Sequence, residues 1–139
     1  MFTIDASVHI NAVNPGEPGS AASQACLQYL IKQQQAVVSP TLLLVEVAAA
    51  AARALDDATL AFELAQAVRL LPGQLWVPLD EELDDEAAYL GAEARLRGAD
   101  AVYAAVARRF GATLVTRDRQ QVERLRAIMP VLTPEEVIG

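Results

Sequence analysis

The chain has 139 residues, of which 53% are hydrophobic and 21% are charged, so its composition excludes a disordered polypeptide and its length predicts one domain, residues 1–139. Six of its 18 acidic residues lie in one run, residues 80–86, and the other 12 nearly balance the 11 basic residues. The net charge of -7 is therefore a local excess and does not exclude a nucleic acid as partner.

Short apolar runs alternate with helical patterns along the whole chain. The runs are rich in Val, Ile and Leu and are bounded by turn residues or charges, which is typical of buried strands. We expect strands at 1–4, 36–38, 75–79, 111–116 and 131–132. Between them we expect a helix from Asp5, a loop at 14–20, a helix from a Ser20 cap to about Gln35, a helix that starts at Pro40 and runs through 41–54, and a helix at 56–71. The later helices are expected at 80–97, at 99–109 after a break at Gly98, and at 119–128, and a final turn is capped at 133–136. This alternation predicts a three-layer α/β/α sandwich with a central, mostly parallel sheet.

Two further features narrow the class of protein. The single Cys26 can form neither an internal disulfide nor a thiolate metal cluster, and its spacing among apolar residues predicts a core position. No apolar run approaches the roughly 20 residues that span a bilayer, and no basic leader precedes the first run. We therefore expect a cytoplasmic protein that is not bound to a membrane.

The acidic run at residues 80–86 has a structural interpretation. It opens a predicted helix, and acids in the first turn complement the positive end of the helix dipole. We favour this interpretation over a docking patch for a partner.

Four other acids come from four separate regions of the chain. Asp5 and Asp118 follow predicted strands, whereas Glu46 and Asp100 lie near the starts of predicted helices. Ligands of open parallel sheets bind beyond the carboxyl ends of the strands, so we expect the four acids to converge there. Crowded carboxylates repel one another, and a divalent cation relieves this repulsion. A carboxylate set without thiols suits Mg²⁺ or Mn²⁺.

Each acid also has a simpler interpretation. An acid after a strand is commonly a helix cap, which is the simpler interpretation for Asp5 alone. Glu46 is harder to explain in this way because residues 42–47 are otherwise apolar, and a buried acid needs a partner. Ser7 and Thr116 are small hydroxyl residues that can orient a carboxylate.

Four segments, taken in order, resemble the signature segments of the PIN-domain ribonuclease family and of its VapC-type toxins. They are residues 3–8 around Asp5, 39–47 around Glu46, 98–107 around Asp100 and 114–118 ending at Asp118. The spacings of 41, 54 and 18 residues between the acids, the total length and the closing segment 132–136 are similar to the family as well. The resemblance covers essentially the whole chain and rests on the ordered set rather than on any one segment.

This resemblance implies a metal-dependent endoribonuclease that uses Mg²⁺ or Mn²⁺ to cleave RNA. It implies that Asp5, Glu46 and Asp100 are the core catalytic and metal-binding acids. Asp118 matches the more variable fourth acid, and the two hydroxyl residues match accessory positions. The resemblance also implies a homodimer and, if the protein is a toxin, a small antitoxin protein as partner.

Three basic side chains near the acids are candidate RNA contacts. Arg117 and Arg119 flank Asp118, so both lie beside the expected site. His9 occupies a position where the family more often has an aliphatic residue, and it lies four residues after Asp5. A hydrogen-bonded structural histidine is the simpler interpretation of His9, and an RNA contact is the alternative.

Other functions compete with the toxin interpretation. A PIN-fold binding or dimerisation module without activity would keep the acids only as caps. A PIN protein that acts in RNA processing outside any toxin pair, or on DNA, would carry the same acids. A receiver domain is excluded because it needs a Lys after a late strand, and Lys32 is the only lysine.

Overall fold

The computed structural model describes residues 1–139, and its centre is one five-stranded sheet in the order β3-β2-β1-β4-β5. The strands are β1 (Phe2–Ile4), β2 (Val37–Pro40), β3 (Gln74–Val77), β4 (Thr113–Val115) and β5 (Val131–Leu132). Every pair of neighbouring strands is parallel. Because β1 and β4 are adjacent, with Ile4 opposite Val115, the residues that follow these two strands emerge side by side.

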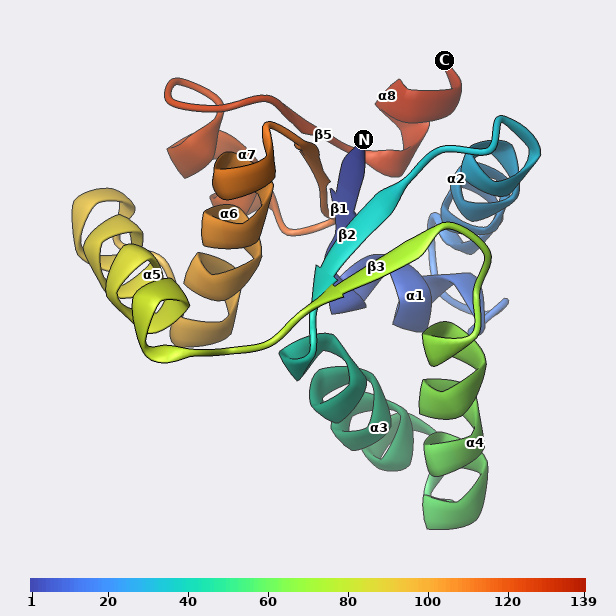
Figure 1. Ribbon diagram of the computed structural model, residues 1–139. Coiled ribbons are helices and arrows are strands. Elements are labelled where there is room, and N and C mark those ends of the chain that lie inside the picture. Colours follow the sequence, from blue (N-terminus) through green and yellow to red (C-terminus); the bar gives the residue numbers. More distant parts are fainter.

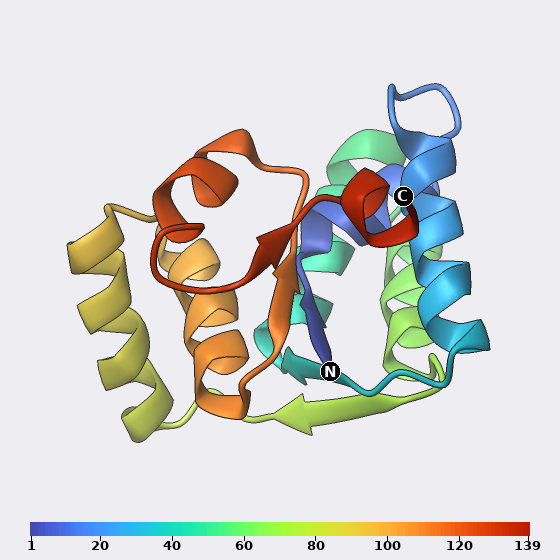
Figure 2. The same cartoon turned by 90° about the horizontal axis from the view of Figure 1, so that it is seen from above.

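Helices cover both faces of this sheet (Figures 1 and 2). They are α1 (Ala6–Ala12), α2 (Ser20–Lys32), α3 (Leu42–Leu55), α4 (Ala58–Arg69), α5 (Glu81–Ala94), α6 (Gly98–Phe110), α7 (Arg119–Leu125) and α8 (Pro134–Ile138). In Figure 2, α5 and α6 lie on one side of the sheet and α1 and α2 on the other. The predicted three-layer fold is confirmed, with a sheet that is wholly parallel. None of the helices has the length and apolar character needed to cross a bilayer.

The core is divided by the sheet into two parts. The larger part surrounds α6, in which every residue from Ala101 to Ala107 is buried. Small alanine side chains let this helix approach both the sheet and α5 closely. The smaller part lies between the sheet and helices α1 and α2, and it contains Ile4, Val115 and Cys26. Cys26 is fully buried, so its predicted core position is confirmed.

Pro40 ends β2 and does not begin a helix as expected. The backbone N–H of Val37 donates to Gly73, just before β3, and that of Thr41 donates to Val77 in β3. Alternate residues of a strand direct their backbone groups to opposite neighbours, so the backbone of Pro40 faces β1. The strand β1 ends at Ile4, short of the position opposite Pro40. The missing N–H of proline therefore leaves no acceptor of the sheet without a partner.

Helix boundaries differ from the expected ones at several places. Gly19 precedes α2 with a φ of +83°, and no side chain caps that helix, so Ser20 is its first residue and not its cap. Helix α5 ends where Arg95 adopts a φ of +55°, and Gly98 is the first residue of α6 and not a separator. Helices α2 and α7 also end a few residues early, at Lys32 and Leu125. Positive φ angles at Gly19, Gln34 and Arg95 mark three of these boundaries, and a hydrophobic pattern does not encode them.

The caps that the sequence predicts at other helices are present. The acidic run begins α5, where the side chain of Asp80 accepts the backbone N–H of Leu83 at 2.9 Å. At the last helix, Thr133 and Glu136 form a reciprocal capping box. The excess of acid at residues 80–86 thus has the structural role that we favoured for it.

Candidate active site

A cleft of about 470 Å³ opens beyond the carboxyl ends of β1 and β4. Its walls come from α1, the exposed face of α3, the beginning of α6 and the turn before α7. Four acids that are far apart in the sequence line this one cleft, namely Asp5, Glu46, Asp100 and Asp118. The parallel sheet brings the first and last of them together because β1 and β4 are neighbours that run in the same direction.

Asp5 is a helix cap and, at the same time, the most strongly held of the four acids. Its Oδ1 accepts the backbone N–H of Ser7 at 3.2 Å, which caps α1. Its Oδ2 accepts three side-chain donors: Ser7 Oγ at 3.1 Å, Thr116 Oγ1 at 2.7 Å and Gln121 Nε2 at 2.8 Å. Asp5 is also buried, so these donors replace the water that an exposed carboxylate would have. The orientation of its carboxylate is therefore set by α1, by the residue that follows β4 and by α7 together.

Asp118 belongs to the same hydrogen-bond network. Its backbone N–H donates to Thr116 Oγ1 at 3.0 Å, and Thr116 in turn donates to Asp5. Its side-chain Oδ1 caps α7 by accepting the backbone N–H groups of Gln120 at 2.8 Å and Gln121 at 3.4 Å. Thr116 thus links the two acids that follow adjacent strands.

Glu46 has a buried partner on a different helix. The hydroxyl of Tyr103, on α6, donates to Glu46 Oε1 at 2.7 Å. Burial of Tyr103, together with this hydrogen bond, raises the pKa of its phenol, so the hydroxyl remains protonated as a donor. This contact supplies the partner that a carboxylate in an apolar stretch requires.

The pKa of Asp100 reflects the negative charge of the cleft. Burial and, after it, the charges of Asp5, Asp118 and Glu46 together raise its pKa to about 6, whereas Arg97 acts in the opposite direction. All three of the other acids therefore act on this carboxyl group. The cleft holds negative charge that the nearby arginine does not balance.

The donor chemistry of the cleft fits a hard divalent cation. Carboxylate oxygens line it, and neither His9 nor Cys26 does. The raised pKa of Asp100 shows that added positive charge would be stabilising there. No three acidic, imidazole or thiol side chains are arranged closely enough to hold an ion as they stand. The structure thus supports the chemistry of a metal site without defining its coordination.

Arg117 does not face the cleft and instead ties three elements together. Its Nη1 donates to Ser23 Oγ on α2 at 3.2 Å and to Glu135 Oε1 on α8 at 3.0 Å. Its guanidinium lies against Gly19, where a Cβ atom would overlap it. Its backbone N–H donates to Ser7 Oγ at 3.2 Å. Because its charged group is engaged on the far side of the turn, Arg117 stays outside the RNA-binding surface proposed below.

We expect Arg117→Ala to lower the free energy of unfolding by about 1–2 kcal/mol, because the buried hydroxyl of Ser23 loses a charged donor. The ion pair with Glu135 adds little to this value because Glu135 is exposed. Arg119→Ala is the matched control: Arg119 is exposed at the start of α7, and its removal should change stability by less than about 0.5 kcal/mol. Urea unfolding of the two variants measures the difference, and equal stabilities would contradict the structural role of Arg117.

His9 also lies away from the cleft. It is 2% exposed and borders a small apolar cavity with Ile4, Leu27 and Leu30. Burial lowers the pKa of His9 to about 4, so the imidazole is neutral at pH 7. A neutral side chain buried on that side offers no charged contact to RNA. The simpler interpretation expected a hydrogen-bonded structural histidine. The side chain is structural in its burial, but its Nε2 has no hydrogen-bond partner.

Four residues at or beneath the cleft were not singled out from the sequence. Two of them, Glu17 and Arg53, line the cleft, and the other two, Tyr103 and Gln121, hold its acids. Arg53 had a usable signal, because it lies seven residues after Glu46 on one helix and hence on the same face. No comparable signal in the sequence marks the other three. The partners of Tyr103 and Gln121 are remote in sequence, and Glu17 lies in a loop that has no regular period.

Comparison with known proteins agrees with this geometry. The sequence matches the family model described as PIN domain over residues 2–127. A search of the curated proteins gives no match. Among solved structures, similar chains occur in FitAB bound to an IR36 DNA fragment (TM-score 0.74, 23% identity, 97% of this chain and 96% of that one) and in VapBC2 of Rickettsia felis bound to promoter DNA (TM-score 0.69, 13% identity, 95% and 97%).

A third similar structure is VapC20 of Mycobacterium tuberculosis, described as a toxin that cleaves the sarcin-ricin loop (TM-score 0.72, 19% identity, 88% of this chain and 94% of that one). At these identities the likeness to solved structures shows the fold. The family model, in contrast, covers nearly the whole sequence and includes all four acids of the cleft. The structural neighbours are VapC and FitB toxins of toxin–antitoxin pairs, and this chain belongs to the PIN-domain family.

Proposed function

We propose that this protein is a metal-dependent endoribonuclease that hydrolyses phosphodiester bonds of RNA. The observation that carries the proposal is that four acids from separate parts of the chain line one cleft, where burial and the other three acids raise the pKa of Asp100. Crowded carboxylates repel one another, which costs stability. Helix caps do not require such crowding, so a function as caps alone does not explain why the four acids share one cleft. Membership of the PIN-domain family supports the same chemistry, since PIN domains are typically nucleases.

In this proposal the four acids of the cleft, Asp5, Glu46, Asp100 and Asp118, hold one or more Mg²⁺ or Mn²⁺ ions. A bound divalent ion would offset the charge of the scissile phosphate and lower the pKa of a water molecule that attacks it. The role of the chain's own residues is to keep these carboxylates oriented. Tyr103 does this for Glu46, and the donors around Asp5 do it for that residue.

Three arginines are placed to bind phosphates of the substrate. Arg53 lines the cleft from α3, and Arg97 lines it from the residue before α6. Arg119 is exposed next to Asp118 at the start of α7. Guanidinium groups suit phosphate because they bind it in a bidentate manner. We therefore propose that Arg53, Arg97 and Arg119 bind phosphates of an RNA strand that enters the cleft.

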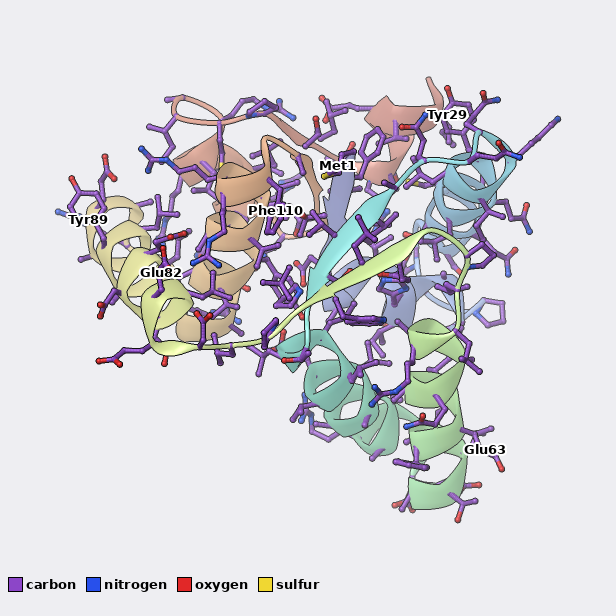
Figure 3. All side chains as sticks on the ribbon, viewed as in Figure 1. Met1, Tyr29, Glu63, Glu82, Tyr89 and Phe110 are labelled. Carbon is purple, nitrogen blue, oxygen red and sulfur yellow. The ribbon has the colours of Figure 1, made fainter.

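The experiment that tests this function compares two glutamates of the same chemistry. Glu46 lines the cleft, whereas Glu63 projects from the outer side of α4 (Figure 3). We expect purified wild type and Glu63→Gln to cut a structured RNA internally in Mn²⁺ and not in EDTA, and Glu46→Gln to show at most about one hundredth of that rate. If Glu46→Gln cuts as fast as Glu63→Gln, the activity does not belong to this cleft, and an inactive binding module becomes the better explanation.

We further propose that the protein is the toxin of a type II toxin–antitoxin pair, with a small antitoxin as partner, and that it forms a homodimer. The similar structures support the antitoxin partner, because one of them is described as a toxin–antitoxin complex. Exposed apolar side chains also support a protein partner: Val45, which lines the cleft from α3, is 64% exposed, and Phe62 on α4 is 60% exposed. Sedimentation that shows only monomer at micromolar concentration would contradict the homodimer.

A further inference from the structure

Gln121 is a buried polar residue that contacts two of the four acids. It is the third residue of α7 and is 1% exposed. Its side-chain Nε2 donates to Asp5 Oδ2 at 2.8 Å, and its backbone N–H lies 3.4 Å from Asp118 Oδ1. A glutamine at this position of a helix commonly bonds back to the residue that caps the helix. Here the side chain reaches a residue more than one hundred positions earlier in the chain instead.

Packing alone does not explain a glutamine at this place. Its Oε1 is buried and has no hydrogen-bond partner. Turning the amide would not help, because Oε1 would then face the carboxylate of Asp5, which is also an acceptor, and the two oxygens would repel each other. A methionine has a similar length and would fill this space without a buried unsatisfied acceptor. The feature that only the glutamine supplies is the hydrogen bond to Asp5.

This hydrogen bond is one of three to the same oxygen of Asp5, and the other oxygen is the less occupied one. Oδ2 accepts donors from Ser7, Thr116 and Gln121, which uses the capacity of a carboxylate oxygen. Oδ1 accepts only the backbone N–H of Ser7. We propose that Gln121 is a positioning residue, which locks the Asp5 carboxylate so that Oδ1 is the oxygen left for a divalent cation. The inference rests on the proposed function and assigns to one residue the orientation of its central acid.

The test compares Gln121→Met with Gln120→Met. Gln120 is the exposed neighbour, whose side chain makes no hydrogen bond to either acid, so it controls for the substitution itself. Mn²⁺ titration by calorimetry should show about tenfold weaker binding for Gln121→Met and unchanged binding for Gln120→Met. Unfolding in EDTA should show that Gln121→Met still unfolds cooperatively, because Asp5 Oδ2 keeps two donors and the unsatisfied Oε1 is gone. Gln121→Leu, which also lacks the donor, serves as a second variant.

A crystal structure of metal-free Gln121→Met gives a second readout, in which the Asp5 carboxylate should have turned from its wild-type orientation. Wild-type Mn²⁺ affinity in Gln121→Met, or an Asp5 carboxylate that keeps its orientation, would overturn the inference. If wild type itself binds no Mn²⁺, the proposed function fails. The orientation of Asp5 in the variant then decides the role of Gln121 by itself: a turned carboxylate supports it and an unturned one refutes it.

Discussion

Asp5→Asn should lower the rate of Mn²⁺-dependent RNA cleavage by at least about 10²-fold while the protein remains folded. Asparagine keeps the size of aspartate and an oxygen that can cap α1 through Ser7, but it lacks the charge that holds a divalent ion. A 10²-fold loss corresponds to about 2.7 kcal/mol of transition-state stabilisation, which is within what one metal ligand supplies. The fold should survive because the amide of Gln121 can turn and accept from the new Asn side chain.

The control for this variant is Asp57→Asn. Asp57 also caps a helix, since it accepts the backbone N–H of Leu60 at 3.0 Å at the start of α4, but it does not line the cleft. Asp57→Asn should cleave RNA at the wild-type rate. Parallel assays with EDTA identify contaminating nuclease, and equal cleavage by the variants of Asp5 and Asp57 would remove the nuclease interpretation of the cleft.

Asp100→Asn should be more stable than wild type at pH 7 in EDTA. Burial and three neighbouring acids disfavour the charged form of Asp100, so the folded protein raises its pKa from 3.8 to about 6. Each pKa unit corresponds to about 1.4 kcal/mol, and for a half-buried group partly screened by solvent we expect a gain of about 1–2 kcal/mol from removing the charge. The favourable contact of the Asp100 charge with the start of α6 reduces this gain by a few tenths of a kcal/mol.

The pH dependence of this difference has a definite sign. Because the pKa of Asp100 is higher in the folded than in the unfolded protein, the folded state binds the proton more tightly. The contribution of Asp100 to stability therefore falls as pH rises from about 4 to about 6, and it stays low above that range. The advantage of Asp100→Asn should be full at pH 7 and absent below pH 4.

Denaturant unfolding of both proteins at several pH values, in EDTA, measures this difference. Millimolar Mn²⁺ should stabilise the wild type more than Asp100→Asn, because an ion that binds the folded state shifts unfolding by mass action. A variant that is less stable than wild type at pH 7 in EDTA would show that Asp100 has a structural role instead.

The sequence by itself determined the fold class and the regions from which the four acids come. Alternating apolar runs and helical patterns predict a parallel sheet covered by helices, because buried strands and amphipathic helices have different periods. The acids at 5 and 118 follow strands in the sequence, and neighbouring parallel strands carry such residues to one edge. These features depend on local chemistry and on a general rule of sheet topology, so a reader of the sequence can reach them.

Only the tertiary structure decided what each side chain near the acids does. Arg117 follows the same strand as Asp118, yet its guanidinium binds α2 and α8 instead of facing the cleft. His9 is buried on the α2 side of α1 although it lies one helical turn after Asp5. Position along the chain places a residue near a site but does not say which way its side chain points.

The hydrogen bonds that hold the acids were equally hidden from the sequence. Tyr103 and Glu46 are 57 residues apart, and Gln121 and Asp5 are 116 residues apart. No periodicity or motif in the sequence marks either pair, because each hydrogen bond forms only when two separate elements pack together in one particular arrangement. Packing of α6 and α7 against the sheet brings these donors within about 3 Å of the carboxylates, which is the range in which a hydrogen bond forms. The sequence placed the four acids on one edge, and this packing decided how two of them are held.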